Sequence, residues 1–365
     1  MGADASIVRR RYGIEDGGNA PADPQGEFVG QNLLYIAQSV EDVSKRVGRP
    51  LDEIVEALSR ARTSMFDARE ARPRPHRDDK VLAAWNGLMI AAFARAGRQL
   101  VESARRDDWR NAARRAALAV ERQLWRPDRR RLLRRAAGDD EAGIDAFCED
   151  YACVVWGYLE VFQMSGEARW LDRAIELTAI QTELFADEAD GGWFSTTGDD
   201  PAVLLRLKED YDGAEPSAAS VTVRNLLTLG RLTGTGSYLD RARRTLERYG
   251  PGLGKVARVM PFMLANAARW HAPAIEVVIA GTRDVADTRA LEAVLARVYL
   301  PSAVTVSLDG TSPTPAALPW LSSMSPRAGR ATAYVCRGFA CQMPTGEPGE
   351  LERQLKDAGE RRVII

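Results

Sequence analysis

Residues 72–96 decide the fold, and they read Arg-Pro-Arg-Pro-His-Arg-Asp-Asp-Lys-Val-Leu-Ala-Ala-Trp-Asn-Gly-Leu-Met-Ile-Ala-Ala-Phe-Ala-Arg-Ala. The first part is a stiff basic arm, because its two prolines fix φ and hold the residues before them extended. Asp78 and Asp79 are expected to open a helix, where carboxylates are favoured by the unpaired N–H groups. Residues 81–96 are almost all apolar or small, and such a helix is buried on every side.

This pattern of an acidic start followed by an apolar helix occurs three times. The acidic starts are Asp78-Asp79, Glu149-Asp150 and Glu215. Each apolar helix is followed by an amphipathic one, expected at 108–124, at 170–185 and from residue 238. The unit recurs about every 60 to 70 residues, which is typical of stacked helical hairpins. Buried inner helices alternating with half-exposed outer helices predict a mainly α protein, an incomplete (α/α)6 toroid.

The pattern changes after Pro273. Three β-rich runs, at 275–280, 303–308 and 331–336, surround an expected helix at 288–299. A strand, a helix and a second strand predict a small α/β unit with parallel pairing. We therefore expect an extended or loop segment at 1–30, the toroid at 31–272, and the α/β unit at 273–365.

Composition narrows the class of protein. The 365 residues carry 50 basic and 51 acidic side chains, a net charge of −1, so no general field favours nucleic acid or an anionic membrane. No leader sequence is recognisable, and no apolar run approaches the roughly 20 residues that span a bilayer. Four cysteines are too few to hold a chain of this size together. A soluble protein in the reducing cytoplasm is the expectation.

The sequence resembles the thioredoxin-domain-containing YyaL and spermatogenesis-associated protein 20 family. The resemblance rests on residues 72–89 and on further motifs in the family's order: Tyr12-Gly13, Gly18-Asn19, Gly26-Glu27-Phe28, Glu149-Asp150-Tyr151-Ala152, Gly191-Gly192-Trp193-Phe194, Asp212-Gly213-Ala214-Glu215-Pro216-Ser217, and Ala333-Tyr334-Val335-Cys336 with Cys341. It implies a barrel related to N-acylglucosamine 2-epimerases and six-hairpin glycosidases, followed by a small α/β unit. It also implies a carbohydrate-related role and an N-terminal thioredoxin-like domain.

Two departures from the family pattern matter. The thioredoxin-like domain and the first barrel helices are not in this sequence, so the ring is expected to be open or completed by another chain. The family also usually reads Pro-Ser-Gly-Asn-Ser where this chain has Pro-Ser-Ala-Ala-Ser at 216–220. Any polar contact that the family's asparagine makes at that helix mouth is therefore in question.

Acidic residues at the inner-helix starts are the candidate catalytic groups. In a toroid these starts converge, and glycosyl or proton transfer needs one protonated and one ionised carboxyl group across a cavity. We assign Asp79 and Asp150 as the acid–base candidates. The alternative is that such residues only cap their helices. Further acids expected to bind substrate are Asp78, Glu149, Asp212 and Glu215.

Other side chains are expected to position a sugar-like ligand. Lys80 and Asn86 would bind hydroxyl groups, and the remaining predicted contacts are Arg74, His76, Trp85, Tyr151, Trp193 and Ser217. For Trp85 the alternative is a place in the core, and for His76 a surface position. Epimerases of the related barrel use two histidines, and neither His76 nor His271 can be matched to them.

Metal, cofactor and redox functions are not expected. Cys148 and Cys153 are five apart on one helix and point in different directions. Cys336 and Cys341 could approach across a turn, and no cysteine pair has zinc spacing. The leading prediction is a sugar-binding protein with isomerase or hydrolase chemistry. The alternative is a non-catalytic scaffold or client-binding module that works with a thioredoxin-like domain or chain.

Overall fold

The computed structural model describes residues 2–21, 25–76, 78–136, 143–199, 201 and 203–359. Within them the chain forms two compact units, Met1–Asp79 and Lys80–Ile365. This division differs from the expected boundaries at 30 and 272. The helices expected at the start of the toroid belong to the first unit, and the α/β part shares the second unit with the helical hairpins.

The first unit contains three helices and a short 3-10 turn. They are η1 (Gly2–Asp4), α1 (Ala5–Tyr12), α2 (Val40–Val47) and α3 (Leu51–Glu70). Ile7, Val43 and Ile54 form its small core. The expectation of a loop over residues 1–30 is therefore wrong at the start of the chain, because Ile7 and Val8 are fully buried on α1.

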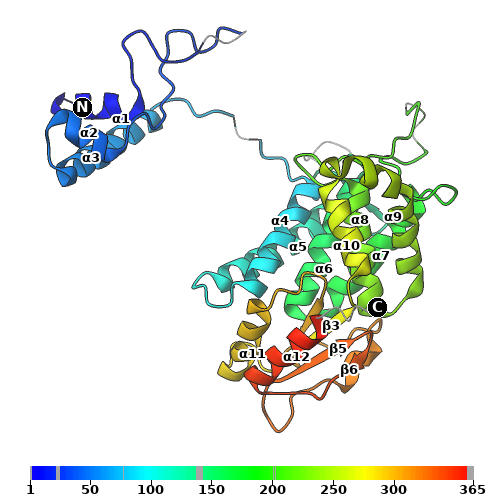
Figure 1. The fold of residues 1–365 in the computed structure, drawn as a ribbon. Coiled ribbons are helices and arrows are strands. Elements are labelled where there is room, and N and C mark those ends of the chain that lie inside the picture. The colour runs from blue at the N-terminus through cyan, green and yellow to red at the C-terminus, as the bar shows by residue number, and fades with distance from the viewer. Residues whose placement is uncertain are drawn as a thin grey trace. The chain divides into compact units, whose positions relative to one another are not determined.

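Helical hairpins make up most of the second unit. Their helices are α4 (Ala83–Gln99), α5 (Arg106–Leu124), α6 (Cys148–Ser165), α7 (Ala168–Phe185), α8 (Ala218–Thr233), α9 (Gly236–Val256) and α10 (Pro261–His271), with a 3-10 turn η2 (Ala257–Val259). A two-stranded hairpin, β1 (Trp125–Arg126) and β2 (Arg131–Leu132), joins α5 to α6. α4 packs on α6, α6 on α8, and α8 on α10, while α5, α7 and α9 each pack on the preceding inner helix (Figure 1). The predicted incomplete α/α toroid is confirmed.

The inner helices α6 and α8 are buried as predicted, but α4 is not. Trp85 is 58% exposed and Met89 is 50% exposed, so the prediction that residues 81–96 are buried on every side is wrong. The described helices that pack on α4 are chiefly α5 and α6, and they leave part of it uncovered.

Every residue of α6 except Glu149 and Trp156 is buried, and so is every residue of α8 except Thr233. Both helices end at a glycine in the left-handed region, Gly166 at φ 70° and Gly234 at φ 69°, which lets the backbone close the last turn without a side-chain clash. The hairpins therefore return the chain sharply and keep the inner helices in contact.

The start of α4 corrects one prediction. Asp78 and Asp79 were expected to open this helix, but it begins at Ala83, and Leu82 is its N-cap residue. Residues 78–80 have no regular structure. A carboxylate that accepts from the first turn of α4 comes from a different helix, as described below.

The α/β part covers the C-terminal ends of the inner helices (Figure 1). Its elements are β3 (Ile275–Ala280), α11 (Ala286–Arg297), β4 (Val304–Leu308), η3 (Pro319–Ser323), β5 (Thr332–Arg337), β6 (Ala340–Cys341) and α12 (Pro348–Gly359). The sheet order is β4-β3-β5-β6, with β3 and β4 parallel and the other pairs antiparallel. The predicted parallel strand–helix–strand unit is confirmed.

Alternation along β3 explains how this sheet joins two cores. Val278 and Ala280 belong to the hydrophobic core of the hairpins, whereas Val277 and Ile279 pack with Leu291 of α11 in a second core. Successive side chains of a strand point to opposite faces, so one face of the sheet covers the helices and the other is covered by α11 and α12.

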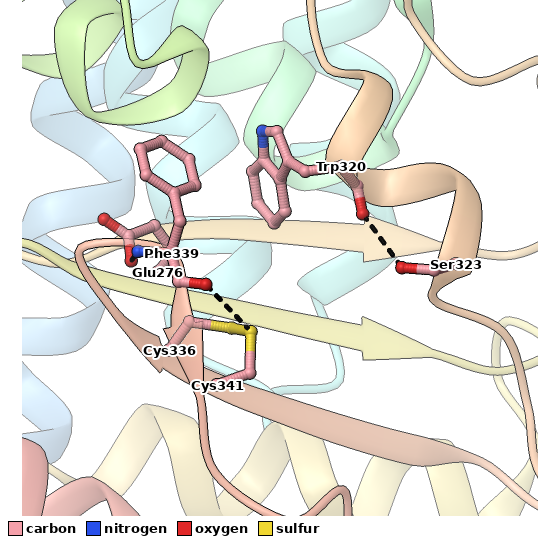
Figure 2. Close-up of a disulfide and its surroundings, with 6 residues drawn as sticks. All are labelled: Glu276, Trp320, Ser323, Cys336, Phe339 and Cys341. Atoms are coloured by element: carbon pink, nitrogen blue, oxygen red, sulfur yellow. Dashed lines mark hydrogen bonds between the residues drawn. A yellow bond between two sulfur atoms is a disulfide. The ribbon is translucent and has the colours of Figure 1, made fainter.

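A disulfide closes the end of the sheet. Cys336 and Cys341 face each other on β5 and β6 and are bonded (Figure 2), which settles the pairing that the sequence left open. Phe339, in the turn between them, stacks edge-on against Trp320 at 5.5 Å between ring centroids. Cys148 and Cys153 are buried and free, as predicted. Among the described helices, none combines the length and the apolar run needed to cross a membrane.

Candidate functional site

The N-termini of three inner helices surround one pocket, which we call the helix-mouth pocket. Its volume is about 230 Å³. It is lined by Leu82, Ala84, Trp85, Arg134, Glu149, Asp150, Cys153, Glu209, Tyr211, Glu215, Pro216, Ser217 and Ala218. The acidic starts of α6 and α8 thus meet at one place, as the repeat predicted.

Asp150 forms the floor of the pocket and joins two helices. Its side chain is 2% exposed. Oδ2 accepts a hydrogen bond from the Phe147 backbone N–H at 2.9 Å, and Oδ1 accepts one from the Ala84 N–H at 3.2 Å. It therefore caps its own helix α6 and also the first turn of α4. The sequence suggested either a site residue or a helix cap, and Asp150 is placed as both, because its carboxylate caps two helices and also lines the pocket.

The charge state of Asp150 is set by competing effects. Burial raises its pKa to about 6, even though the Phe147 N–H and the Arg134 guanidinium both favour the ionised form. Arg134 Nη1 lies 3.2 Å from Asp150 Oδ2 and donates to Glu149 Oε1 at 2.5 Å. Asp150 can therefore gain or lose a proton close to neutral pH, beside a permanent positive charge.

Trp85 lies at the pocket with its ring largely in solvent. The side chain is on the first turn of α4 and 58% of the residue is exposed, so the alternative of a core position is wrong. Its indole Nε1 donates to Glu215 Oε1 at 2.6 Å, which ties α4 to the loop before α8. Glu209 and Tyr211 complete this side of the pocket.

Asp212 and Ser217 hold the loop that carries Glu215. Asp212 Oδ1 accepts from the Ser217 N–H at 2.9 Å, and its Oδ2 accepts from the Phe262 N–H at 2.8 Å at the start of α10. Ser217 caps α8 by accepting from the Ser220 N–H at 3.2 Å. Ser217 lines the pocket and Asp212 does not, so Asp212 positions the loop and the helices around it.

Three further predicted contacts, besides Asp212, lie outside the lining. Asn86 donates to the Leu82 carbonyl oxygen at 2.8 Å, one turn back along α4. The hydroxyl of the fully buried Tyr151 accepts from the Leu132 N–H at 2.9 Å. Trp193 is 2% exposed, and its Nε1 donates to a threonine of α9. Tyr151 and Trp193 are core residues, because in both the polar atom is used within the fold.

The remaining predicted residues precede the helical hairpins. Arg74, His76, Asp78 and Asp79 belong to the first unit, after the end of α3, and Lys80 begins the second unit. Arg74 forms an ion pair with Glu70 of α3. The proposed roles of these residues, that of Asp79 as a catalytic acid included, remain predictions.

Arg134 is a residue of the site that the sequence did not indicate. It pairs with Glu149, and its guanidinium lies 4.9 Å from the centre of the Phe147 ring. The usable signal was its place in the segment that joins β2 to α6, on the side of the acid pair of α6. Among the described residues no cluster of histidine, cysteine and acidic side chains has an arrangement that could hold a metal ion.

Comparison with known proteins places the chain among relatives of similar sequence. It is 35% identical to human spermatogenesis-associated protein 20 over 361 residues, which is 96% of this chain and 45% of the human protein. It is 27% identical to the uncharacterized protein B0495.5 of Caenorhabditis elegans, over 95% of this chain and 48% of that protein. The chain spans about half the length of the curated relatives it matches, and the resemblance inferred from the motifs is confirmed.

Solved structures resemble the chain more distantly. The GH76 α-mannanase BT2949 of Bacteroides thetaiotaomicron aligns with 79% of this chain and 71% of its own, with a TM-score of 0.41 and 12% identity. The family 76 mannosidase Bt3792 of the same species covers 46% of this chain and 44% of its own, with a TM-score of 0.34 and 14% identity. No protein-family model matches the chain. Conclusions about chemistry therefore rest on the residues of this chain.

Proposed function

We propose that the chain, which is similar in sequence to spermatogenesis-associated protein 20 over about half the length of that protein, binds a sugar-like ligand in the helix-mouth pocket. One observation carries the proposal. The exposed ring of Trp85 is held by its hydrogen bond to Glu215 at a pocket that also contains Asp150, Glu149 and Glu209. A fixed aromatic surface beside several carboxylates suits a ligand with one apolar C–H face and many hydroxyl groups.

The size and charge of the pocket support this ligand class. Its volume of about 230 Å³ lies below the roughly 300–1,000 Å³ of pockets for drug-sized ligands, so one sugar ring is a better fit than a polymer. The carboxylates accept hydrogen bonds from hydroxyl groups, and Arg134 supplies donors. The two kinds of polar group can thus satisfy both the donors and the acceptors of a sugar.

Proton transfer is the chemistry that these residues suit. A carboxyl group with a pKa of about 6, such as that of Asp150, exists in both protonation states near neutral pH. Epimerisation, isomerisation and glycoside hydrolysis each need such a group next to a second acid or base. We propose Asp150 as this group, with Glu149, Glu209 and Glu215 as possible second carboxylates. Asp79 is the second acid predicted from the sequence.

The first test measures binding. The purified protein is incubated with a pooled panel of mono- and disaccharides, and saturation-transfer NMR reports which sugars bind. Trp85→Ala should abolish the transfer, whereas Trp109→Ala should leave it unchanged, since Trp109 lies on the outer helix α5 and does not line the pocket. Equal binding by the wild type and Trp85→Ala would contradict the proposal.

The second test measures turnover in the same samples. New anomeric signals that disappear in Asp150→Asn would establish an enzyme, and binding without new signals would leave a sugar-binding protein. Failure to bind any sugar, repeated with the longer chain that the relatives possess, would favour the alternative scaffold. That scaffold would work with a thioredoxin-like domain, and co-purification of such a chain would support it.

A further inference from the structure

Besides the helix-mouth pocket, two cavities lie at the opposite, C-terminal ends of the inner helices, where the α/β part covers them. The two adjoining cavities have volumes of about 390 and 480 Å³ and share Arg95, Arg224 and Arg269 in their linings. Arg98 lines the smaller one. We call the region around these four arginines the arginine pocket. It has no residue in common with the helix-mouth pocket.

Positive charge is in excess in the arginine pocket. Four guanidinium groups reach it from α4, α8 and α10, and the exposed Arg297 of α11 also lines the smaller cavity. Among the described residues that line the two cavities, Glu160 is the one carboxylate. Buried ions cost several kilocalories per mole each unless an opposite charge and hydrogen bonds compensate them, as a rough guide. A single carboxylate cannot neutralise four guanidinium groups.

Both carboxylate oxygens of Glu160 already accept hydrogen bonds from described residues. Its Oε2 accepts from Arg98 Nη2 at 2.8 Å, and its Oε1 accepts from Arg224 Nη2 and, at 3.3 Å, from Trp156 Nε1. Burial alone would raise the pKa of Glu160, but the charges of Arg98 and Arg224 outweigh it and hold the pKa at about 2. The group is therefore ionised at any physiological pH and serves mainly these two arginines.

Three N–H groups of the arginine pocket have no hydrogen-bond acceptor among the described residues. Arg224 Nη1, Arg98 Nε and Arg269 Nε are buried and have no hydrogen-bond partner within the described part of the chain. The Arg224 side chain is 9% exposed, so bulk solvent does not compensate it. Burial and the nearby charges of Arg224 and Arg231 lower the pKa of Arg269 well below its usual value. An anion among these groups would relieve both the missing hydrogen bonds and the repulsion.

The other wall of the pocket is apolar. Phe262, Ile275 and Pro301 line the larger cavity, and the Phe262 ring stacks on Trp156 at 5.3 Å between centroids. Tyr299 is 88% exposed at its rim, and the Arg95 side chain is 46% exposed, so a ligand can enter from solvent. A ligand that fits both walls has an anionic end and an apolar or planar body.

We propose that the arginine pocket binds a small phosphate monoester, with the phosphate between Arg224, Arg269 and Arg95 and the ester group against Phe262. The guanidinium groups come from three different helices, so they approach an anion from several directions. A phosphate offers three oxygen atoms and up to two charges to such a set, whereas a carboxylate offers two oxygen atoms in one plane. The site lies outside the helix-mouth pocket and does not depend on the function proposed for it.

Isothermal titration of the whole chain tests the proposal. The probes are phenyl phosphate, inorganic phosphate and benzoate at constant ionic strength, in a buffer free of other phosphate. Phenyl phosphate is expected to bind more tightly than inorganic phosphate, because its ring adds the apolar contact. Both should bind more tightly than benzoate.

Variants separate a specific site from general attraction to a basic surface. Arg269→Gln and Arg95→Gln should each weaken phenyl phosphate binding about tenfold, the expected loss of one charge-assisted hydrogen bond. Arg243→Gln should bind as the wild type does, since Arg243 pairs with Glu247 on the exposed surface of α9. Melting temperatures confirm that each variant folds, and the half-exposed Arg95 provides a second reading if Arg269→Gln does not.

Three results would overturn the proposal. They are no heat of binding with either phosphate probe, equal affinity in all three arginine variants, or benzoate binding more tightly than phenyl phosphate. The last would identify a carboxylate site instead.

Discussion

Replacing Asp150 by asparagine should make the stability of the protein respond differently to pH. Burial raises the pKa of Asp150 from 3.8 to about 6 in the folded state. Between these values the folded protein holds a proton that the unfolded chain has released, so stability falls as pH rises through this window and levels off above about pH 6. A shift of about two pKa units corresponds to about 3 kcal/mol of unfolding free energy. Asparagine cannot titrate, so this contribution disappears.

Urea unfolding at several pH values between 4 and 7 measures the effect. Relative to Asp150→Asn, the unfolding free energy of the wild type should fall by about 2–2.5 kcal/mol from pH 4 to pH 7, because part of the full contribution is already lost at pH 4. The control is Asp240→Asn, an exposed carboxylate on α9, whose difference from the wild type should stay small. An advantage that grew with pH would refute the reasoning. It would mean that Arg134 and the backbone N–H donors outweigh burial and keep Asp150 ionised.

Two further substitutions test the packing of the inner helices. Glu160→Gln should lower the unfolding free energy by about 3–5 kcal/mol at pH 7, because it leaves Arg98 and Arg224 buried without their counter-charge. Denaturant unfolding measures this loss, and an unchanged midpoint would show that the ion pairs do not stabilise the fold. Gly87→Ala should cost about 1–3 kcal/mol, since a Cβ there would lie 2.5 Å from the Cys153 carbonyl oxygen where α4 crosses α6. Gly97→Ala should cost less, because its Cβ would first meet a side-chain atom, Arg110 Cγ at 2.6 Å, and equal losses would contradict a backbone clash at Gly87.

The architecture was predictable because it follows from local patterns. Continuous apolar runs identified α6 and α8 as buried, although the same pattern overestimated the burial of α4, and the stripes of the helices that follow identified the outer layer. A run of β-branched residues likewise identified β3. These signals fail where burial comes from distant partners, so α1 was missed: its short apolar pair matters only through Val43 and Ile54.

The candidate site was predictable only in part. The sequence marked Glu149, Asp150 and Glu215 as helix-start acids, and the helix-mouth pocket brings all three together. It could not show that the polar atoms of Tyr151 and Trp193 form hydrogen bonds inside the core. An aromatic residue at a helix start or after loop glycines has the same local sequence whether its ring points into the core or into solvent.

The sequence by itself determined the hairpin repeat, the change to an α/β part after residue 273, and the family resemblance, since each depends on residues close together in the chain. Only the tertiary structure decided that Asp150 caps α4 as well as α6, that Arg134 joins the acids, and that four arginines from three helices line a pocket beside a single described carboxylate, Glu160. The physical reason is that charge balance and desolvation depend on which groups meet in space, and the inner helices α4, α6 and α8, which pack on one another, begin more than 60 residues apart in the chain.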